Sequence, residues 1–358
     1  MFRKDSFKQL NSLKEFNLLQ SQPTQIFLCH TPLHIIISCL VASADNTIEQ
    51  SLFVVVNDSK NLIDIAENFG KHLGFHFLPF KGGADATTRF QAMLYQQHNV
   101  KLLKQIAKNI PNIYIFHDLR PESQALLNNR STSVNQKFVM LEDGVALYPT
   151  KGILPSSLLS IIKRKLAFGL DWKHADELGL HPEINEIRCF FPHLVQKNLN
   201  KKYITPLPIL VTSKLRSVLG IHSDLINPFS LIALVPHSSI VCINDLNIFI
   251  TTCQNYALAN KLSLIFKLHP RDYEGQELIK SKIPGAVFLP NEFAFESFLM
   301  QNDQPAAIIG FRTSSIHILK SLFPDIACFF FEIGDTAESL IWSQFLVSAG
   351  INKIDYPL

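Results

Sequence analysis

Three short polar motifs stand out because each one directly follows an apolar run of the length expected for a buried strand. They are Glu142-Asp143-Gly144, His269-Pro270 and Thr313-Ser314-Ser315. A carboxylate can accept a proton as a general base, and an imidazole can bind a phosphate or protonate a leaving group. Hydroxyl groups at a helix start add to the anion site that its free N–H groups and dipole form. Together the motifs indicate a group transfer from an anionic donor.

Each motif also has an ordinary structural explanation. Asp-Gly is a common turn, and Gly144 allows the chain to turn sharply. Pro270 favours an extended conformation for His269, which fits a turn histidine as well as a ligand-binding one. Ser and Thr at a helix start commonly cap its free N–H groups. The indication of function therefore comes from the combination of motifs and from their placement.

The elements that position these motifs are read from apolar runs that alternate with amphipathic helical patterns. In the first half the sequence predicts strands at 25–31, 51–56, 75–80, 112–118 and 137–143, with helices at 34–44, 60–74 and 100–110. In the second half it predicts strands at 231–237, 262–269, 285–290, 306–312 and 325–331, with helices at 245–260, 293–300, 314–323 and 337–349. Continuous apolar strands with helices between them predict parallel sheets covered on both faces. Ligands of such sheets lie beyond the carboxyl ends of the strands, where the three motifs fall.

This alternation predicts an α/β protein of two Rossmann-like domains with mostly parallel sheets facing across a cleft, the arrangement called GT-B. The first domain is expected at 1–205, on the acceptor side, with a connecting and lid-like region at 150–205. The second, at 206–358, is expected to hold the anionic donor.

Composition narrows the class of protein. Of 358 residues, 47% are hydrophobic and 18% charged, as in a globular protein, and a net charge of +3 gives no reason to expect a nucleic-acid partner. Neither G-x-x-x-x-G-K-[ST] nor G-x-G-x-x-G occurs. The N-terminus lacks the apolar core of a secretory signal, and no stretch reaches the ~18 apolar residues of a membrane span. The six cysteines are scattered, without C-x-x-C, which indicates buried reduced thiols in a cytoplasmic protein.

A family resemblance now becomes visible. "LEDG", "KLHP" and "TSS", in this order, resemble the shared motifs of the bacterial GT-B sialyltransferases. These comprise the lipooligosaccharide sialyltransferases of glycosyltransferase family 52 and the capsule polysialyltransferases. "CHTPLHIII" is similar to the "TPLQ" start of the lipooligosaccharide enzymes, as is "EDGVALYP" followed by "IKRKLAFGL". The resemblance extends over roughly 25–345.

The resemblance implies a role for each motif. Glu142 would be the general base that deprotonates the acceptor hydroxyl, supported by Asp143. His269 would bind the CMP phosphate and help the nucleotide leave. The remaining residues of the implied nucleotide site are Pro270, Thr313, Ser314, Ser315 and Gly144.

The implied reaction moves sialic acid, or a related nonulosonate, from its CMP-activated form to a bacterial surface glycan of lipopolysaccharide or capsule. Transfer would invert the anomeric centre, with no cofactor and no metal. Two alternatives stay open: a transferase that uses another nucleotide sugar, and a CMP-binding protein of the same fold without turnover.

Other histidines and one further acid are assigned outside the three motifs. His34 stands where the lipooligosaccharide enzymes have Gln, which bears on the identity of the acceptor. His34, His117 and Asp118 are expected on the acceptor side, although a structural role fits the last two equally well. His30 and His34 have the spacing of a zinc pair, but Pro32 lies between them and H-E-x-x-H is absent.

Two further segments complete the predictions. Ser238 and Ser239 fit either the nucleotide site or a helix cap. The basic segment 156–172, which contains Lys163, Arg164 and Lys165, is expected on the inner face of the cytoplasmic membrane, although a solvated helix is an alternative.

Overall fold

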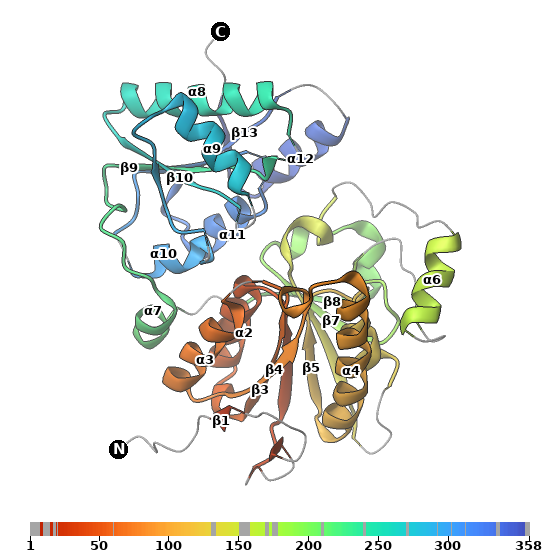
Figure 1. The fold of residues 1–358 in the computed structure, drawn as a ribbon. Coiled ribbons are helices and arrows are strands. Elements are labelled where there is room, and N and C mark those ends of the chain that lie inside the picture. Colours follow the sequence, from red (N-terminus) through yellow and green to blue (C-terminus); the bar gives the residue numbers. More distant parts are fainter. Residues whose placement is uncertain are drawn as a thin grey trace. The chain divides into compact units, whose positions relative to one another are not determined.

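A computed structural model divides the chain into two compact units, Met1–Val218 and Leu219–Leu358. The residues that it describes are 8–9, 15–16, 19, 21–59, 61–129, 134–149, 158–168, 172–173, 178–208, 211–238, 241–269, 272–291, 293–301, 303–311, 313–333 and 337–354. Each unit is an α/β domain with helices on both faces of its sheet (Figure 1).

The first unit is built on a parallel sheet. Its strands are β1 (Lys8–Gln9), β2 (Gln25–Cys29), β3 (Ser51–Asn57), β4 (His76–Lys81), β5 (Asn112–Ile115), β6 (Lys137–Leu141), β7 (Ile184–Cys189) and β8 (Tyr203–Pro206), in the order β1-β4-β3-β2-β5-β6-β7-β8. Its α-helices are α2 (Pro32–Ala44), α3 (Leu62–Leu73), α4 (Arg89–Ile106), α5 (Pro121–Leu127), α6 (Leu158–Phe168) and α7 (Ser213–Leu219). Short 3₁₀ helices are η1 (Ile48–Gln50), η2 (Gly83–Asp85), η3 (Ala107–Asn109), η4 (Gly144–Leu147), η5 (Pro192–Leu194) and η6 (Lys197–Lys201).

The second unit repeats the architecture with a smaller sheet. Its strands are β9 (Ser230–Leu234), β10 (Ser263–Lys267), β11 (Val287–Phe288), β12 (Ala307–Phe311), β13 (Ala327–Phe331) and β14 (Asn352–Lys353), in the order β11-β10-β9-β12-β13-β14. Its α-helices are α8 (Ile243–Ala259), α9 (Tyr273–Lys282), α10 (Phe295–Gln301), α11 (Ser315–Leu322) and α12 (Ala337–Ser348).

The strand order reverses at one point in each sheet. β2 lies between β3 and β5, and β9 lies between β10 and β12. Successive connections from β2 or β9 therefore run first to one side and then to the other. In open parallel sheets, ligands bind at this reversal, outside the carboxyl ends of the strands.

Aromatic packing fills the interior of both units. In the first, Phe27 of β2 stacks on Tyr114 of β5 with ring centroids 4.4 Å apart, and Phe53 of β3 stacks on Phe75 at 3.9 Å. In the second, Phe249 of α8 packs at 5.4 Å from Phe311 of β12. Strands β2, β9 and β12 are buried at every position, which explains why their sequences lack polar alternation.

The predicted α/β fold with two parallel sheets is confirmed, and every predicted strand overlaps an observed one. β7 and β8 were not expected, because they lie in the segment predicted as a connecting region. β7 carries Glu186 and Arg188, whose side chains pair at 2.8 Å, so this strand shows no continuous apolar run. α4 begins at Arg89 rather than near residue 100, and no residue of this helix before Asn99 is buried, so its first turns lack the buried apolar stripe that marks the predicted part.

The cysteines are all free, and five of the six are buried as predicted. Cys242 is the exception: it is exposed just before α8, and its Sγ accepts a hydrogen bond from the Asp245 N–H at 3.4 Å. Burial raises the pKa of Cys29 and of Cys189 to about 12.

Gly310 in β12 gives a test of how tightly the second sheet holds α11. A Cβ atom at this position would lie 2.9 Å from Cδ1 of Ile316 and 3.0 Å from Cγ2 of Thr313. We expect Gly310→Ala to lower the free energy of unfolding by about 1–3 kcal/mol, because overpacking shifts these neighbours. Urea denaturation measures the change.

Gly285, in the turn before β11, is the matched control. A Cβ atom there would meet nothing within 4 Å, so Gly285→Ala is expected to be neutral or slightly stabilising. Equal stabilities for the two variants would contradict the close packing described for Gly310.

Candidate functional site

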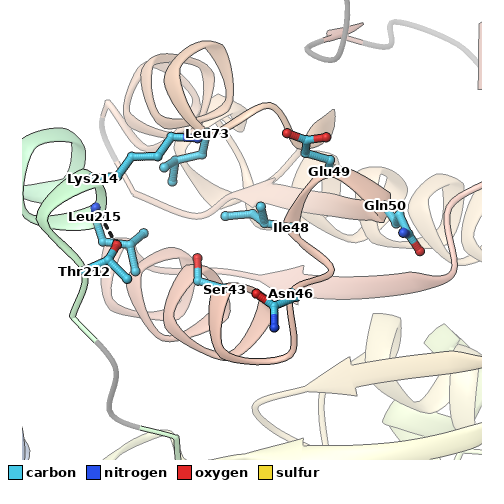
Figure 2. Close-up of a pocket in the computed structure, with 9 residues that line it drawn as sticks. All are labelled: Ser43, Asn46, Ile48, Glu49, Gln50, Leu73, Thr212, Lys214 and Leu215. Carbon is cyan, nitrogen blue, oxygen red and sulfur yellow. Dashed lines mark hydrogen bonds between the residues drawn. The ribbon is translucent and has the colours of Figure 1, made fainter. Parts of the chain in front are cut away.

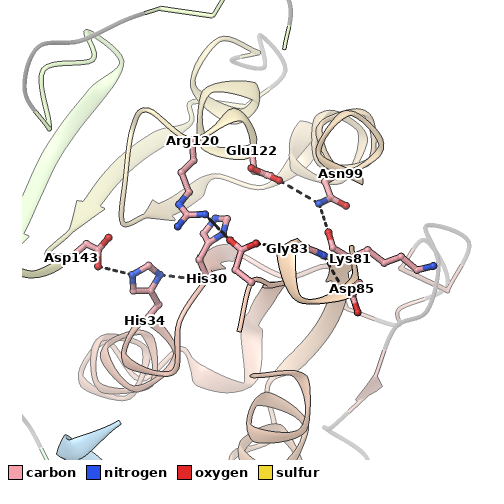
Figure 3. Close-up of polar contacts among 11 residues, drawn as sticks. His30, His34, Lys81, Gly83, Asp85, Asn99, Arg120, Glu122 and Asp143 are labelled. Atoms are coloured by element: carbon pink, nitrogen blue, oxygen red, sulfur yellow. Dashed lines mark hydrogen bonds and ion pairs between the residues drawn. The ribbon is translucent and has the colours of Figure 1, made fainter. Parts of the chain in front are cut away.

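Polar side chains gather at the carboxyl ends of the strands of the first sheet, around the reversal between β2 and β5 (Figure 3). The chain leaves β2 at His30 and enters α2 at once. Thr31 caps α2 by accepting a hydrogen bond from the N–H of His34 at 3.2 Å, and Pro32 occupies the first turn. The cap brings the side chain of His34 back over the sheet, where its ring stacks on Phe116 with centroids 3.9 Å apart and planes at 4°.

Two hydrogen bonds define the protonation of His34. The backbone N–H of His30 donates to Nδ1 of His34 at 3.1 Å, so Nδ1 acts as an acceptor and carries no proton. Nε2 therefore carries the proton and donates it to Oδ1 of Asp143 at 2.9 Å. Both ring nitrogens are engaged, which leaves His34 no lone pair for a zinc ion.

Asp143 is the part of this pair that solvent can reach. Its side chain is 31% exposed, whereas that of His34 is 1% exposed. Burial works to raise the pKa of the Asp143 carboxyl, but the His34 ring that bonds to it, followed by His117 and Arg120, lowers this pKa to about 2. Asp143 is thus held ionised at an accessible position.

Glu142, the predicted general base, is buried in the first unit. Its side chain is 0% exposed. Its Oε2 accepts hydrogen bonds from the hydroxyl of Tyr148 at 2.5 Å and from the N–H of Phe190 at 2.7 Å. Gly144 turns the chain after the acids with φ of 76°, in the left-handed region that favours glycine. The adjacent acids therefore separate, one into the protein and one toward solvent.

His117 and Asp118, both expected on the acceptor side, also differ in placement. Nδ1 of His117 accepts a hydrogen bond from the N–H of Leu119 at 3.1 Å. Asp118 is 1% exposed, and its Oδ2 accepts the N–H groups of Gly179 and His181, both at 3.1 Å. Asp118 therefore anchors the 179–181 loop, while His117 lies close enough to Asp143 to influence its pKa.

One group beside this site was not predicted from the sequence. Asp58, just after β3, accepts a hydrogen bond from Arg120 Nη1 at 2.6 Å and pairs with Nδ1 of His30 at 2.9 Å through the same oxygen. Its other oxygen accepts the N–H of Gly83 at 2.9 Å. Both Asp58 and His30 directly follow strands, so the same rule that selected Asp143 would have found them.

In the second unit, the predicted residues lie at the carboxyl edge of the sheet as expected. His269 is exposed and follows β10. Thr313, Ser314 and Ser315 are half-buried between β12 and α11, where Thr313 Oγ1 accepts a hydrogen bond from the N–H of Ser315 at 3.4 Å. Ser314 occupies the cap position of α11 without a side-chain capping bond. Pro270 lies outside the described residues, as do Arg312 and Ser239.

Ser238 has a structural partner. Its N–H and its hydroxyl donate to the two carboxylate oxygens of Asp272, at 2.9 and 2.8 Å. These bonds tie the loop after β9 to the loop after β10. The structure thus gives Ser238 a loop-tying role in addition to the two that were predicted for it.

A separate pocket lies near the amino ends of the strands of the first sheet (Figure 2). It is lined by Ser43, Asn46, Ile48, Glu49, Gln50, Leu73, Thr212, Lys214 and Leu215. These residues lie at the ends of α2 and α3, before β3, and at the start of α7. They are therefore remote from the carboxyl-edge cluster around Asp143.

Two features are absent from the part of the chain that the structure describes. No group of three or more His, Cys, Asp or Glu side chains there is arranged to hold a metal ion. None of the described helices combines the length and the apolar character that crossing a bilayer requires.

Solved structures share this two-sheet architecture. An alpha/beta-galactoside alpha-2,3-sialyltransferase from Photobacterium phosphoreum aligns with 93% of this chain and 99% of its own, at 13% identity and a TM-score of 0.56. A 2,6-sialyltransferase from Photobacterium sp. JT-ISH-224, solved with CMP and lactose, covers 93% and 78% at 13% identity and a TM-score of 0.52. A UDP-GlcNAc 2-epimerase from Methanocaldococcus jannaschii covers 93% and 89% at 10% identity and a TM-score of 0.54. These likenesses define a GT-B fold.

Sequence comparison identifies the family. The chain belongs to the alpha-2,8-polysialyltransferase family, whose model matches residues 7–330. The match supports a sialyltransferase-like glycosyltransferase, in agreement with the resemblance read from the three motifs. A comparison with curated protein sequences gives no match.

His117 yields a prediction about pH. Burial lowers its pKa to about 4, against about 6.5 in an unfolded chain. Between these values the unfolded chain binds more protons, so the free energy of unfolding falls as pH drops from 6.5 to 4. We expect His117→Asn to reduce this slope by up to about 1.4 kcal/mol per pH unit, measured by urea denaturation from pH 4 to 7.

His222 provides the control, because its side chain is 68% exposed and makes only a surface pair with Asp224. His222→Asn should leave the slope unchanged. His30 is also buried, and its pKa is also lowered to about 4. Part of the pH dependence of the free energy of unfolding should therefore remain in both variants. Identical slopes for wild type and His117→Asn would show that His117 titrates normally in the folded protein.

Proposed function

We propose that this protein transfers sialic acid, or a related nonulosonate, from its CMP-activated form to a glycan acceptor with inversion. The family match and the GT-B fold support sialyl transfer. The observation that carries the proposal is the accessible Asp143 carboxylate, held by the proton on Nε2 of His34 at the strand-order reversal of the first sheet. A related fold has been solved with CMP and lactose, which supports a CMP donor.

In the proposed reaction, Asp143 is the general base. The acceptor hydroxyl gives its proton to Asp143 while its oxygen bonds to the anomeric carbon, and CMP departs from the opposite face of that carbon. Glu142 was predicted for this role, but its side chain has no solvent contact and its Oε2 already accepts two hydrogen bonds. We therefore assign Glu142 to holding the Asp143 loop in place. A low pKa keeps Asp143 ionised, and proton transfer accompanies bond formation rather than preceding it.

The donor phosphate is proposed to lie in the second unit, at His269, Thr313, Ser314 and Ser315. These residues follow β10 and β12, the two strands that flank β9, at the reversal where nucleotides bind in sheets of this order. Imidazole and hydroxyl donors meet the charge that develops on the leaving phosphate, so no metal ion or cofactor is required. Gly144, in the first unit, is proposed to make room for the nucleotide sugar.

Substitution of the two adjacent acids tests the proposal. Asp143→Asn keeps the shape of the side chain but removes its basicity, so transfer from CMP-sialic acid should fall by about 10²–10⁴-fold. CMP affinity should stay near wild type, because the donor phosphate is held by the other unit. Glu142→Gln keeps a carbonyl oxygen as acceptor, so it should retain more activity than Asp143→Asn. Product formation and calorimetric CMP binding are the measurements.

Asp64, an exposed acid on α3, supplies the control through Asp64→Asn, which should match wild type. If the wild-type protein transferred the sugar of another nucleotide sugar and not that of CMP-sialic acid, the proposed CMP donor would be wrong. CMP binding with no turnover of any tested acceptor would favour the binding-protein alternative. Full activity in Asp143→Asn together with loss of activity in Glu142→Gln would show that Glu142, and not Asp143, is the general base.

We further propose that α6 docks this protein on an anionic lipid surface that carries its acceptor. Leu158, Leu159, Ile162 and Leu166 are exposed, at 79%, 67%, 55% and 76%. At about 100° per residue they form one stripe about 100° wide. Lys163 and Lys165 fall on either side of that stripe, where their charges can meet anionic headgroups.

Neighbouring residues support this lipid-facing surface. Arg164 is directed away from the stripe and lies over the ring of Trp172 at 5.4 Å. α6 contacts α4, and the first turns of α4 carry the exposed side chains of Phe90 and Leu94, 65% and 46% exposed. The expected location of the protein on the inner face of the cytoplasmic membrane depends on this lipid-binding role of α6.

Vesicle sedimentation tests the surface. The double variant Leu159→Asp, Leu166→Asp should lose binding to vesicles of phosphatidylglycerol and phosphatidylcholine, because burying the charges in lipid is costly. Lys163→Glu with Lys165→Glu should weaken binding mainly at low salt, by about 1 kcal/mol per basic residue removed. Leu258→Asp, at an 81% exposed leucine of α8, is the control. Sedimentation of all variants like wild type would refute the proposal.

A further inference from the structure

His237 occupies the central position at the carboxyl edge of the second sheet. It follows β9, and the strand order places β9 between β10 and β12. Leu234 of β9 pairs with Lys267 of β10 on one side and with Gly310 of β12 on the other. His237 lies three residues after Leu234, Thr313 lies three residues after Gly310, and His269 lies two residues after Lys267. His237 therefore stands between the two motifs predicted to hold the donor phosphate.

The side chain of His237 meets that of His269. Their ring centroids are 5.2 Å apart and the planes are inclined at 66°. His237 is half-buried and His269 is exposed, so the pair lies at the surface of the sheet edge rather than within the core. Two imidazoles at this distance can both donate N–H groups to one tetrahedral anion.

A buried carboxylate fixes the loop that carries His237. Asp272 is 1% exposed, and its oxygens accept the N–H and hydroxyl of Ser238. Oδ1 also accepts the N–H of Gly275 at 3.0 Å. A Cβ atom on Gly275 would clash with Oδ2 of Asp272, so a side chain at this position would displace that oxygen. The residue next to His237 is thus bound to the loop that follows His269.

The hydrogen bonds that Asp272 accepts also keep its own carboxyl ionised. Burial works to raise the pKa of Asp272, but the hydrogen bonds from Gly275 and Ser238 and the nearby His237 lower it. Its oxygens are already occupied by donors, so an added anion would meet the imidazoles rather than the carboxylate.

We propose that His237 binds the same donor phosphate as His269, so that the nucleotide phosphate is held between two imidazoles at the β9 strand end. The proposal rests on the CMP donor of the proposed function. It adds a phosphate-binding residue from "LVPHSS", a segment where only the serines were singled out from the sequence.

Calorimetry with CMP, cytidine and inorganic phosphate tests this inference on the full chain. His237→Asn should raise the Kd for CMP about tenfold and leave that for cytidine unchanged, as expected for the loss of one charge-assisted hydrogen bond. His269→Asn should act in the same way. In the double variant the loss should differ from the sum of the single losses, because the two side chains share one ligand. His222→Asn, on an exposed histidine of the same unit, should match wild type.

Thermal unfolding without ligand shows whether each variant is folded. The imidazole spectrum of isotopically labelled wild type gives a second readout: the His237 and His269 signals should both shift on addition of CMP. Unchanged CMP affinity in His237→Asn, or equal weakening of CMP and cytidine, would overturn the inference and leave the CMP donor intact. Failure of wild type to bind CMP would overturn both.

Discussion

One hydrogen bond determines the chemistry available at the first sheet: the main-chain N–H of His30 donates to Nδ1 of His34. Since a main-chain N–H can only donate, Nδ1 is the acceptor in this bond and the ring proton lies on Nε2. That proton faces Asp143, which lies 109 residues further along the chain. Stacking on Phe116 fixes the plane of the ring. The orientation of the candidate base therefore depends on the tight turn from β2 into α2.

A common construction recurs at the carboxyl edges of both sheets. Asp58, Glu142 and Asp272 each accept N–H groups from the loop that follows a neighbouring strand. Each carboxylate thereby holds adjacent loops together without contributing to the core. Oxygens of these three acids are occupied by hydrogen bonds, so we do not assign the acids a role in the reaction. Asp143 bonds to the side chain of His34 instead of to a loop, and it stays accessible to a substrate.

The sequence supports the fold better than it supports the details of the site. Continuous apolar runs predicted ten strands and the parallel sheets, because a strand that is buried on both faces consists almost entirely of apolar residues. β7 was missed since its Glu186 and Arg188 neutralise one another within the sheet. The choice between Glu142 and Asp143 depended on Tyr148 and on Phe190, a residue 48 positions away, and no local pattern reports such contacts.

The exposure of Cys242 has a practical consequence. The other five cysteines are buried, and the thiolate is the species that reacts with electrophiles. A maleimide fluorophore should therefore attach to Cys242 alone, without removal of any native thiol. Cys242 begins α8 in the same connection that leaves β9, so the emission of that dye would report on the loop of the second sheet in an otherwise unaltered chain.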